Sequence, residues 1–130
     1  MIFLVVVICI IGAMPGKENA IYSKKLLPFI SDSLFLKTRI SGNENLAVIS
    51  MSSEVKFSPD STAEYVIDLQ SPVLYKCTKD SIILFGTRKL SQPRFFNSDI
   101  RIKLMLLDNP EMMDLISDKK YLKLKLEKIE

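Results

Sequence analysis

Apolar and polar residues alternate along the chain from Leu34 to the C-terminus, which predicts a protein built mainly of β-strands. The clearest stretch is residues 62–85, where alternating runs are separated by Pro72 and by the polar pair Lys79-Asp80. Proline interrupts a strand because it has no N–H to donate to the ladder. This stretch therefore predicts consecutive strands that are each half buried.

Further alternating runs lie at residues 34–40, 46–57, 99–107 and 121–130. In the run at residues 46–57 the apolar residues move from one alternating set of positions to the other near Val48-Ile49. This predicts a bulge or a break, because a one-residue slip exchanges the two faces of a strand. In the third, Met105 and Leu107 make the far end apolar on both faces. We therefore expect that end to be central in a sheet or covered.

One segment departs from the two-residue period. Asn109-Pro110-Glu111 combines a capping residue, a proline at the first helical position and an acid in the first turn, and Met112 and Leu115 follow at helical spacing. The pattern predicts a short helix near residues 110–118. We expect it to cover one open end of the core.

Together these elements predict an all-β, mainly antiparallel fold, with about seven strands in a sandwich or a partly closed barrel. The chain has 130 residues, which is enough for one hydrophobic core. We assign residues 21–130 to a single β-rich domain and residues 1–20 to a signal peptide or a short membrane anchor.

Residues 1–14 contain no charged side chain, but the run is shorter than the roughly 20 residues that a membrane-spanning helix needs. It resembles the apolar part of a secretory signal peptide, although no Lys or Arg precedes it. We expect a protein exported to the periplasm, the cell surface or the medium. The alternatives are a membrane anchor, with membrane contact only through residues 1–14, and an N-terminal buried strand.

Composition removes several kinds of chemistry. The chain has no His, which is the usual general base and the commonest metal ligand, and its net charge is only +3. None of its 4 glycines fits a phosphate-binding loop, and its 2 cysteines cannot form a four-cysteine zinc site. We expect no cofactor, no metal and no specific nucleic-acid binding. Cys77 lies among apolar strand positions, so we interpret it as a small hydrophobic residue rather than a reactive thiol.

Acidic residues could in principle form a carboxylate-dependent site in a cleft of the sandwich. The available acids are Asp60, Glu64, Asp68, Asp80, Asp99 and Asp108. Most lie at predicted turns, where Asp is favoured because its side chain bonds the local backbone. We therefore expect no enzyme, and a small hydrolase or lyase remains the alternative.

Cations recur on the outward faces of three predicted strands. They are Lys37, Arg39, Arg101, Lys103, Lys123 and Lys125. If those strands were neighbours, the six cations would form a stripe able to bind phosphate, anionic lipid or polysaccharide. The simpler interpretation, which we favour, is solvated strand faces whose lysines discourage aggregation through sheet edges.

Two other features could bind a partner protein. Phe95 and Phe96 follow Pro93-Arg94 in a loop, where they would either anchor a partner or plug the end of the sandwich. The predicted terminal strand, residues 121–130, would offer unpaired backbone groups to another chain if it lies at a sheet edge. The sequence thus favours a small exported, non-catalytic binding or structural module. A membrane-tethered accessory subunit is a further alternative.

Overall fold

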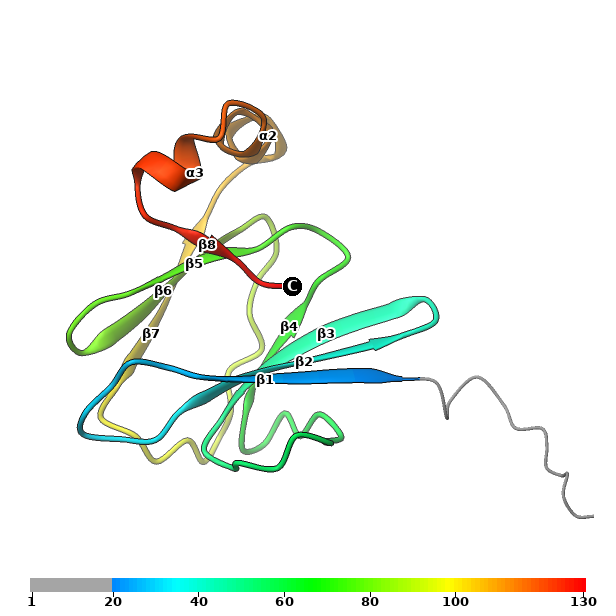
Figure 1. The fold of residues 1–130 in the computed structure, drawn as a ribbon, viewed down its shortest axis with the longest axis vertical. Helices are drawn as coiled ribbons and strands as arrows, with labels where there is room; N and C mark the ends of the chain where they lie inside the picture. The colour runs from blue at the N-terminus through cyan, green and yellow to red at the C-terminus, as the bar shows by residue number, and fades with distance from the viewer. Residues whose placement is uncertain (1–19) are drawn as a thin grey trace, which may run out of the picture.

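The computed structural model describes residues 20–130, and it contains two four-stranded sheets and two short helices (Figure 1). The sheets do not close into a barrel, and the arrangement is β-sandwich-like. The all-β prediction is therefore confirmed, with eight strands in place of about seven. The predictions made for residues 1–14 and for the leader as a whole lie outside the described residues.

The first sheet follows chain order, β1-β2-β3-β4, and every neighbouring pair is antiparallel. Its strands are β1 (Ile21–Leu26), β2 (Phe35–Ser41), β3 (Glu44–Ser50) and β4 (Tyr65–Asp68). Ser41 pairs with Glu44, so Gly42 and Asn43 alone connect β2 to β3. Gly42 has a φ of +56°, a left-handed conformation that glycine adopts without steric cost in tight hairpins.

The second sheet has the order β7-β6-β5-β8 and contains a parallel pair. Its strands are β5 (Leu74–Cys77), β6 (Ser81–Gly86), β7 (Arg101–Leu106) and β8 (Glu127–Lys128). β5 is antiparallel to both of its neighbours, whereas β6 and β7 are parallel. Because parallel strands need a crossover, residues 87–100 return along the side of the sandwich. On the way Ser91 forms an isolated bridge with Val66 of β4.

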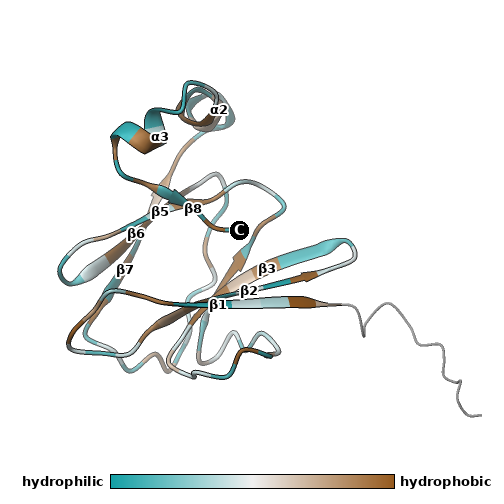
Figure 2. Ribbon diagram, viewed as in Figure 1, coloured by the Kyte–Doolittle hydropathy of each residue, from teal (hydrophilic) through white to brown (hydrophobic). Residues whose placement is uncertain are grey.

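The main core lies between the two sheets. Leu36, Ile49 and Ile67 come from the first sheet, and they pack in one cluster with Ile82 and Leu84 of the second. The turns of the β2–β3 and β5–β6 hairpins, which project away from the core, are mainly hydrophilic (Figure 2). The predicted alternation is thus explained by the apolar side chains of both sheets, which point into one shared core.

The outer face of the first sheet is covered as well. Lys37 of β2 was predicted on an outward face, and it does point away from the core, but its exposed fraction is only 1%. The segment that follows β3 lies over it: the Lys37 ammonium donates to the carbonyl of Glu54 at 3.0 Å and sits 5.4 Å from the centroid of the Phe57 ring. The prediction of a solvated Lys37 is therefore wrong.

The same covering segment explains the change of apolar phase in β3. The strand runs from Glu44 to Ser50 without the predicted break, and both Val48 and Ile49 are fully buried. Ile49 belongs to the main core. Val48 pairs with Lys37 and shares the outer face that the segment after β3 covers. A strand that is covered on both faces carries apolar residues at both parities.

The predicted helix is confirmed as α2 (Asn109–Ser117), but its position differs from the expectation. Asp108, not Asn109, is the N-cap, and it forms a capping box with Glu111. Met112 and Leu115 pack against Leu74 of β5 in a second cluster, which lies on the outer face of the second sheet. The helix therefore does not close an open end of the main core.

The prediction of a strand across residues 121–130 is wrong. The segment begins in the short helix α3 (Lys120–Lys123), and only Glu127–Lys128 pairs as β8. Of its three alternating leucines, Leu126 is buried in the α2 cluster, whereas Leu122 and Leu124 are exposed. Lys125 has a positive φ, which turns the backbone there and prevents an extended strand.

Replacing Lys37 tests the covered outer face. We expect Lys37→Ala to reduce the free energy of unfolding by about 2–4 kcal/mol, because it empties a buried site and leaves the Glu54 carbonyl unpaired. Lys24 is the matched control, since it pairs directly with Lys37, bonds the neighbouring Ser53 carbonyl and is exposed. Lys24→Ala should cost less than about 1 kcal/mol in urea unfolding. Equal losses in the two variants would contradict the structure.

Candidate functional site

β7 lies at the end of the second sheet and has a free edge. The Arg101 N–H donates to the Asp80 carbonyl at 3.0 Å, and the Leu107 N–H donates to the Gly86 carbonyl at 2.8 Å. Backbone groups alternate in direction along a strand, so the N–H groups of Ile102, Leu104 and Leu106 point away from β6. No other segment of residues 20–130 pairs with them.

The prediction that the apolar end of β7 is central or covered holds for Leu107, which packs in the α2 cluster, and is wrong for Met105. Met105 is 50% exposed and Leu106 is 54% exposed. The α2 cluster includes Phe85 of β6, the direct partner of Met105, and Leu107 just after β7, but it does not include Met105. The helix layer therefore covers the residue that follows β7 and leaves Met105 and Leu106 exposed.

The other sheet edges are shorter, bridged or more polar. Residues 20–130 contain three of them besides β7, namely β1, β4 and β8. β4 is bridged to Ser91, and β8 has only two residues. β1 is as long as β7, but it carries the polar residues Ser23, Lys24 and Lys25 in succession. β7 therefore offers the longest apolar edge.

The structure does not bring the six predicted cations together. Lys37 and Arg39 lie on β2 of the first sheet, where Arg39 forms an ion pair with Glu44. Arg101 and Lys103 lie on β7 of the second sheet, Lys123 ends α3, and Lys125 lies in the turn after it. The stripe on three neighbouring strands is therefore wrong as a geometry, because its strands belong to different sheets or do not form.

Two of those cations do lie at the free edge. Arg101 and Lys103 are exposed on the outer face of β7, and neither forms an ion pair within residues 20–130. Lys103 pairs with Ile83, which in turn pairs with Lys76, so these three residues form one row across the sheet. Lys76 was missed in the sequence because the row depends on how the strands pair.

The aromatic pair is divided between the core and the solvent. Phe96 packs edge-on against Tyr65, with 4.9 Å between the ring centroids, and contacts the main core. Phe95 is 70% exposed beside it. The Phe95 N–H donates to the carbonyl of Thr62 at 2.9 Å, which holds this loop close to the start of β4.

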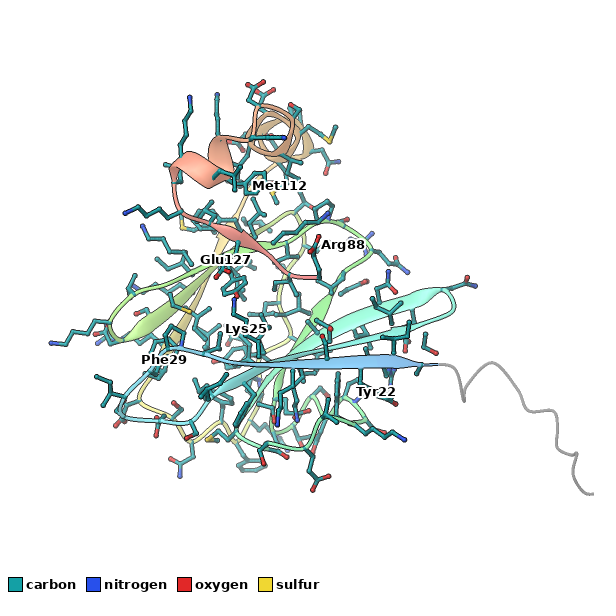
Figure 3. All side chains as sticks on the ribbon, viewed as in Figure 1. Tyr22, Lys25, Phe29, Arg88, Met112 and Glu127 are labelled. Carbon is teal, nitrogen blue, oxygen red and sulfur yellow. The ribbon has the colours of Figure 1, made fainter. Side chains whose placement is uncertain are left out.

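An ion pair links the two sheets across one open side. The Lys25 ammonium of β1 donates to the Tyr75 hydroxyl of β5 at 2.8 Å and to the Glu127 carboxylate of β8 at 2.9 Å (Figure 3). The hydrogen bond from Lys25 lowers the pKa of Glu127, and the bonds to Tyr75 and then Glu127 raise the pKa of Lys25. Burial raises the pKa of Tyr75.

Five of the six predicted turn acids, all except Asp99, bond a residue within four positions in the chain. Asp60 bonds Thr62, which lowers its pKa, Asp68 bonds Arg88, and Asp108 caps α2. Burial raises the pKa of Cys77, which keeps its thiol protonated near neutral pH. Within residues 20–130 no three His, Cys, Asp or Glu side chains gather closely enough to bind a metal ion.

None of the helices between residues 20 and 130 has both the length and the apolar character that crossing a bilayer requires. The chain matches no family model, and searches of the curated proteins and of the solved structures found no match either. Function must therefore be argued from the geometry of the site alone.

The Lys25–Glu127 pair predicts a small acid-dependent loss of stability. Because the folded pKa of Glu127 lies below its ordinary value of 4.5, the pair stabilises the fold above that pH, and the contribution is lost as pH falls through the folded pKa. Both side chains are more than half exposed, so Glu127→Gln should cost less than about 1 kcal/mol at pH 7.

The measurement is urea unfolding of Glu127→Gln at pH 7 and at pH 3, with Glu54→Gln as the control. The difference in unfolding free energy between Glu127→Gln and the parent protein should shrink at pH 3. A difference that is the same at both pH values would show that the pair does not form.

Proposed function

We propose that this protein is a non-catalytic binding module that accepts an extended segment of a partner protein as an additional strand along β7. The observation that carries the proposal is the row of outward backbone groups at Ile102, Leu104 and Leu106. Binding by strand addition takes its affinity from main-chain hydrogen bonds and its specificity from alternate side chains. We retain the expectation that the protein is exported, on the basis of the apolar run at residues 1–14.

The charges beside the edge select an acidic partner. An added strand would place alternate side chains on the outer face of the sheet, next to Arg101, Lys103 and Met105. Opposite charges on neighbouring strands stabilise the pair, and like charges destabilise it. A segment that alternates Asp or Glu with apolar residues therefore fits this edge best.

The same cations disfavour pairing of β7 with a second copy of itself. Two β7 strands laid edge to edge would bring Arg101 and Lys103 of one copy close to those of the other. An acidic partner gains from the cations that repel a second copy. The edge can thus stay open for a partner without driving self-association.

The enzymatic alternative has less support. A carboxylate-dependent hydrolase or lyase needs two acids facing each other across a cleft. In residues 20–130 the acids at positions 60, 68 and 108 bond Thr62, Arg88 and the α2 backbone. This local use of the carboxylates favours a binding role.

Selection from a library of random ten-residue peptides displayed on phage tests the proposal. We expect the enriched peptides to alternate acidic and apolar residues, and to bind Leu106→Ala within a few-fold of the parent protein. Leu106→Pro should bind about tenfold more weakly than Leu106→Ala, because both lack the leucine side chain but only proline lacks the outward N–H.

The Leu106 N–H makes no bond to β6, so Leu106→Pro should retain the fold, and its unfolding midpoint in urea checks this. Enriched peptides that bind the two variants equally would contradict strand addition at β7. A selection that enriches no peptide sequence would also contradict the proposal.

A further inference from the structure

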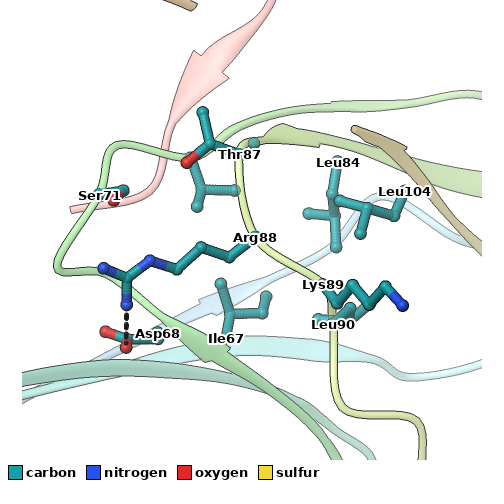
Figure 4. Close-up of a pocket in the computed structure, with 11 residues that line it drawn as sticks. Ile67, Asp68, Ser71, Leu84, Thr87, Arg88, Lys89, Leu90 and Leu104 are labelled. Atoms are coloured by element: carbon teal, nitrogen blue, oxygen red, sulfur yellow. Dashed lines mark hydrogen bonds and ion pairs between the residues drawn. The ribbon is translucent and has the colours of Figure 1, made fainter. Parts of the chain in front are cut away.

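A small cavity opens on the side of the sandwich that the crossover connection passes, away from the outer edge of β7. It has a volume of about 170 Å³ and lies between β4, the β6–β7 pair and residues 87–90 (Figure 4). Its floor is apolar. The floor is formed by Ile67, Val73, Leu84, Leu90 and Leu104.

The size of the cavity suits a small organic molecule. An engineered apolar cavity of about 150 Å³ in another protein binds benzene, so a cavity of this volume accommodates a comparable apolar group. Gly86 contributes to the space. It lies on β6 with its missing side chain toward the interior, and a Cβ added there would meet only Val73, at 3.6 Å.

The mouth of the cavity carries an unbalanced positive charge. Arg88 reaches across it and forms a 3.0 Å ion pair with Asp68 (Figure 4). Lys89, the next residue, is exposed, points away from the Arg88 guanidinium (Figure 4) and forms no ion pair within residues 20–130. Two cations and one carboxylate leave one positive charge, which a single ligand carboxylate would balance.

We propose that this cavity binds a small monocarboxylate with an apolar body. The hydrocarbon part occupies the floor around Leu84 and Leu104, and the carboxylate bonds the Arg88 guanidinium at the mouth, where Lys89 adds to the positive field. Neutral molecules of the same size bind more weakly, because they leave the positive charge at the mouth unbalanced. The site uses side chains that point inward from β6 and β7, so it is independent of the outward backbone edge proposed above for a partner protein.

Hexanoate and 1-hexanol are the probes, and methyl NMR of the full chain is the measurement. Hexanoate should shift the methyl signals of Leu84, Leu90 and Leu104, and it should bind at least about fivefold more tightly than 1-hexanol. In Arg88→Gln that preference should disappear or fall sharply, while 1-hexanol still binds.

Gly86→Val is the cavity-filling variant. Gly86 does not have a positive φ, so a side chain is allowed there, and the added methyl groups should occupy the cavity and abolish binding of both probes. Its thermal unfolding midpoint should equal or exceed that of the parent protein. If Gly86→Val fails to fold, Gly86→Ala adds a single methyl group and should weaken both probes several-fold.

Three results would overturn the proposal. The first is the absence of methyl shifts with either probe up to its solubility limit. The second is equal affinity for hexanoate and 1-hexanol in the parent protein, which would remove the role of the cations. The third is unchanged binding in a folded Gly86 variant, which would place the probes elsewhere.

Discussion

The parallel pairing of β6 with β7 is the constraint on which the rest of this structure depends. Every other strand pair in residues 20–130 is antiparallel. Four of these pairs join strands that are consecutive in the chain, and the fifth joins β5 to the C-terminal strand β8. A parallel pair forces the chain to travel back along the sandwich before β7 begins. β7 is the last strand of its sheet, and within residues 20–130 no segment pairs with its outer backbone.

The return path also shapes the other side of the molecule. It brings Ser91 to Val66, which closes the edge of β4, and it brings Arg88 to Asp68 at the mouth of the cavity. The connection that leads to the open edge of β7 therefore also bridges the edge of β4. The two binding proposals share this origin, although they use different groups: main-chain N–H and C=O at β7, and inward side chains at the cavity.

The sequence contained enough to predict the sandwich and the helix. Strand periodicity depends on side chains that face a common apolar layer, and residues such as Ile67, Ile82 and Leu84 do so. The helix start at Asn109-Pro110 is local chemistry, which needs no knowledge of distant contacts. These parts could be predicted because the alternation within a strand and the start of a helix can both be read from consecutive residues.

What could not be predicted depends on contacts between distant segments. Lys37 is buried because the chain after β3 folds back over it, and no local pattern distinguishes it from the exposed Lys24. The alternating leucines after Tyr121 looked like a strand, but Leu126 packs against α2 and the preceding residues form a helix. The pairing of Lys103 with Ile83, and so the composition of the candidate site, depends on strand order.

The central claim is that β7 pairs on one side only, and residue-resolved amide hydrogen exchange of the isolated protein tests it most directly. The N–H groups of Lys103 and Met105, which face β6, should exchange slowly. Those of Ile102, Leu104 and Leu106 should exchange much faster, which gives an alternating pattern along one strand. Uniform protection along residues 101–106 would contradict the account, because it would mean that another segment or another copy already covers the edge.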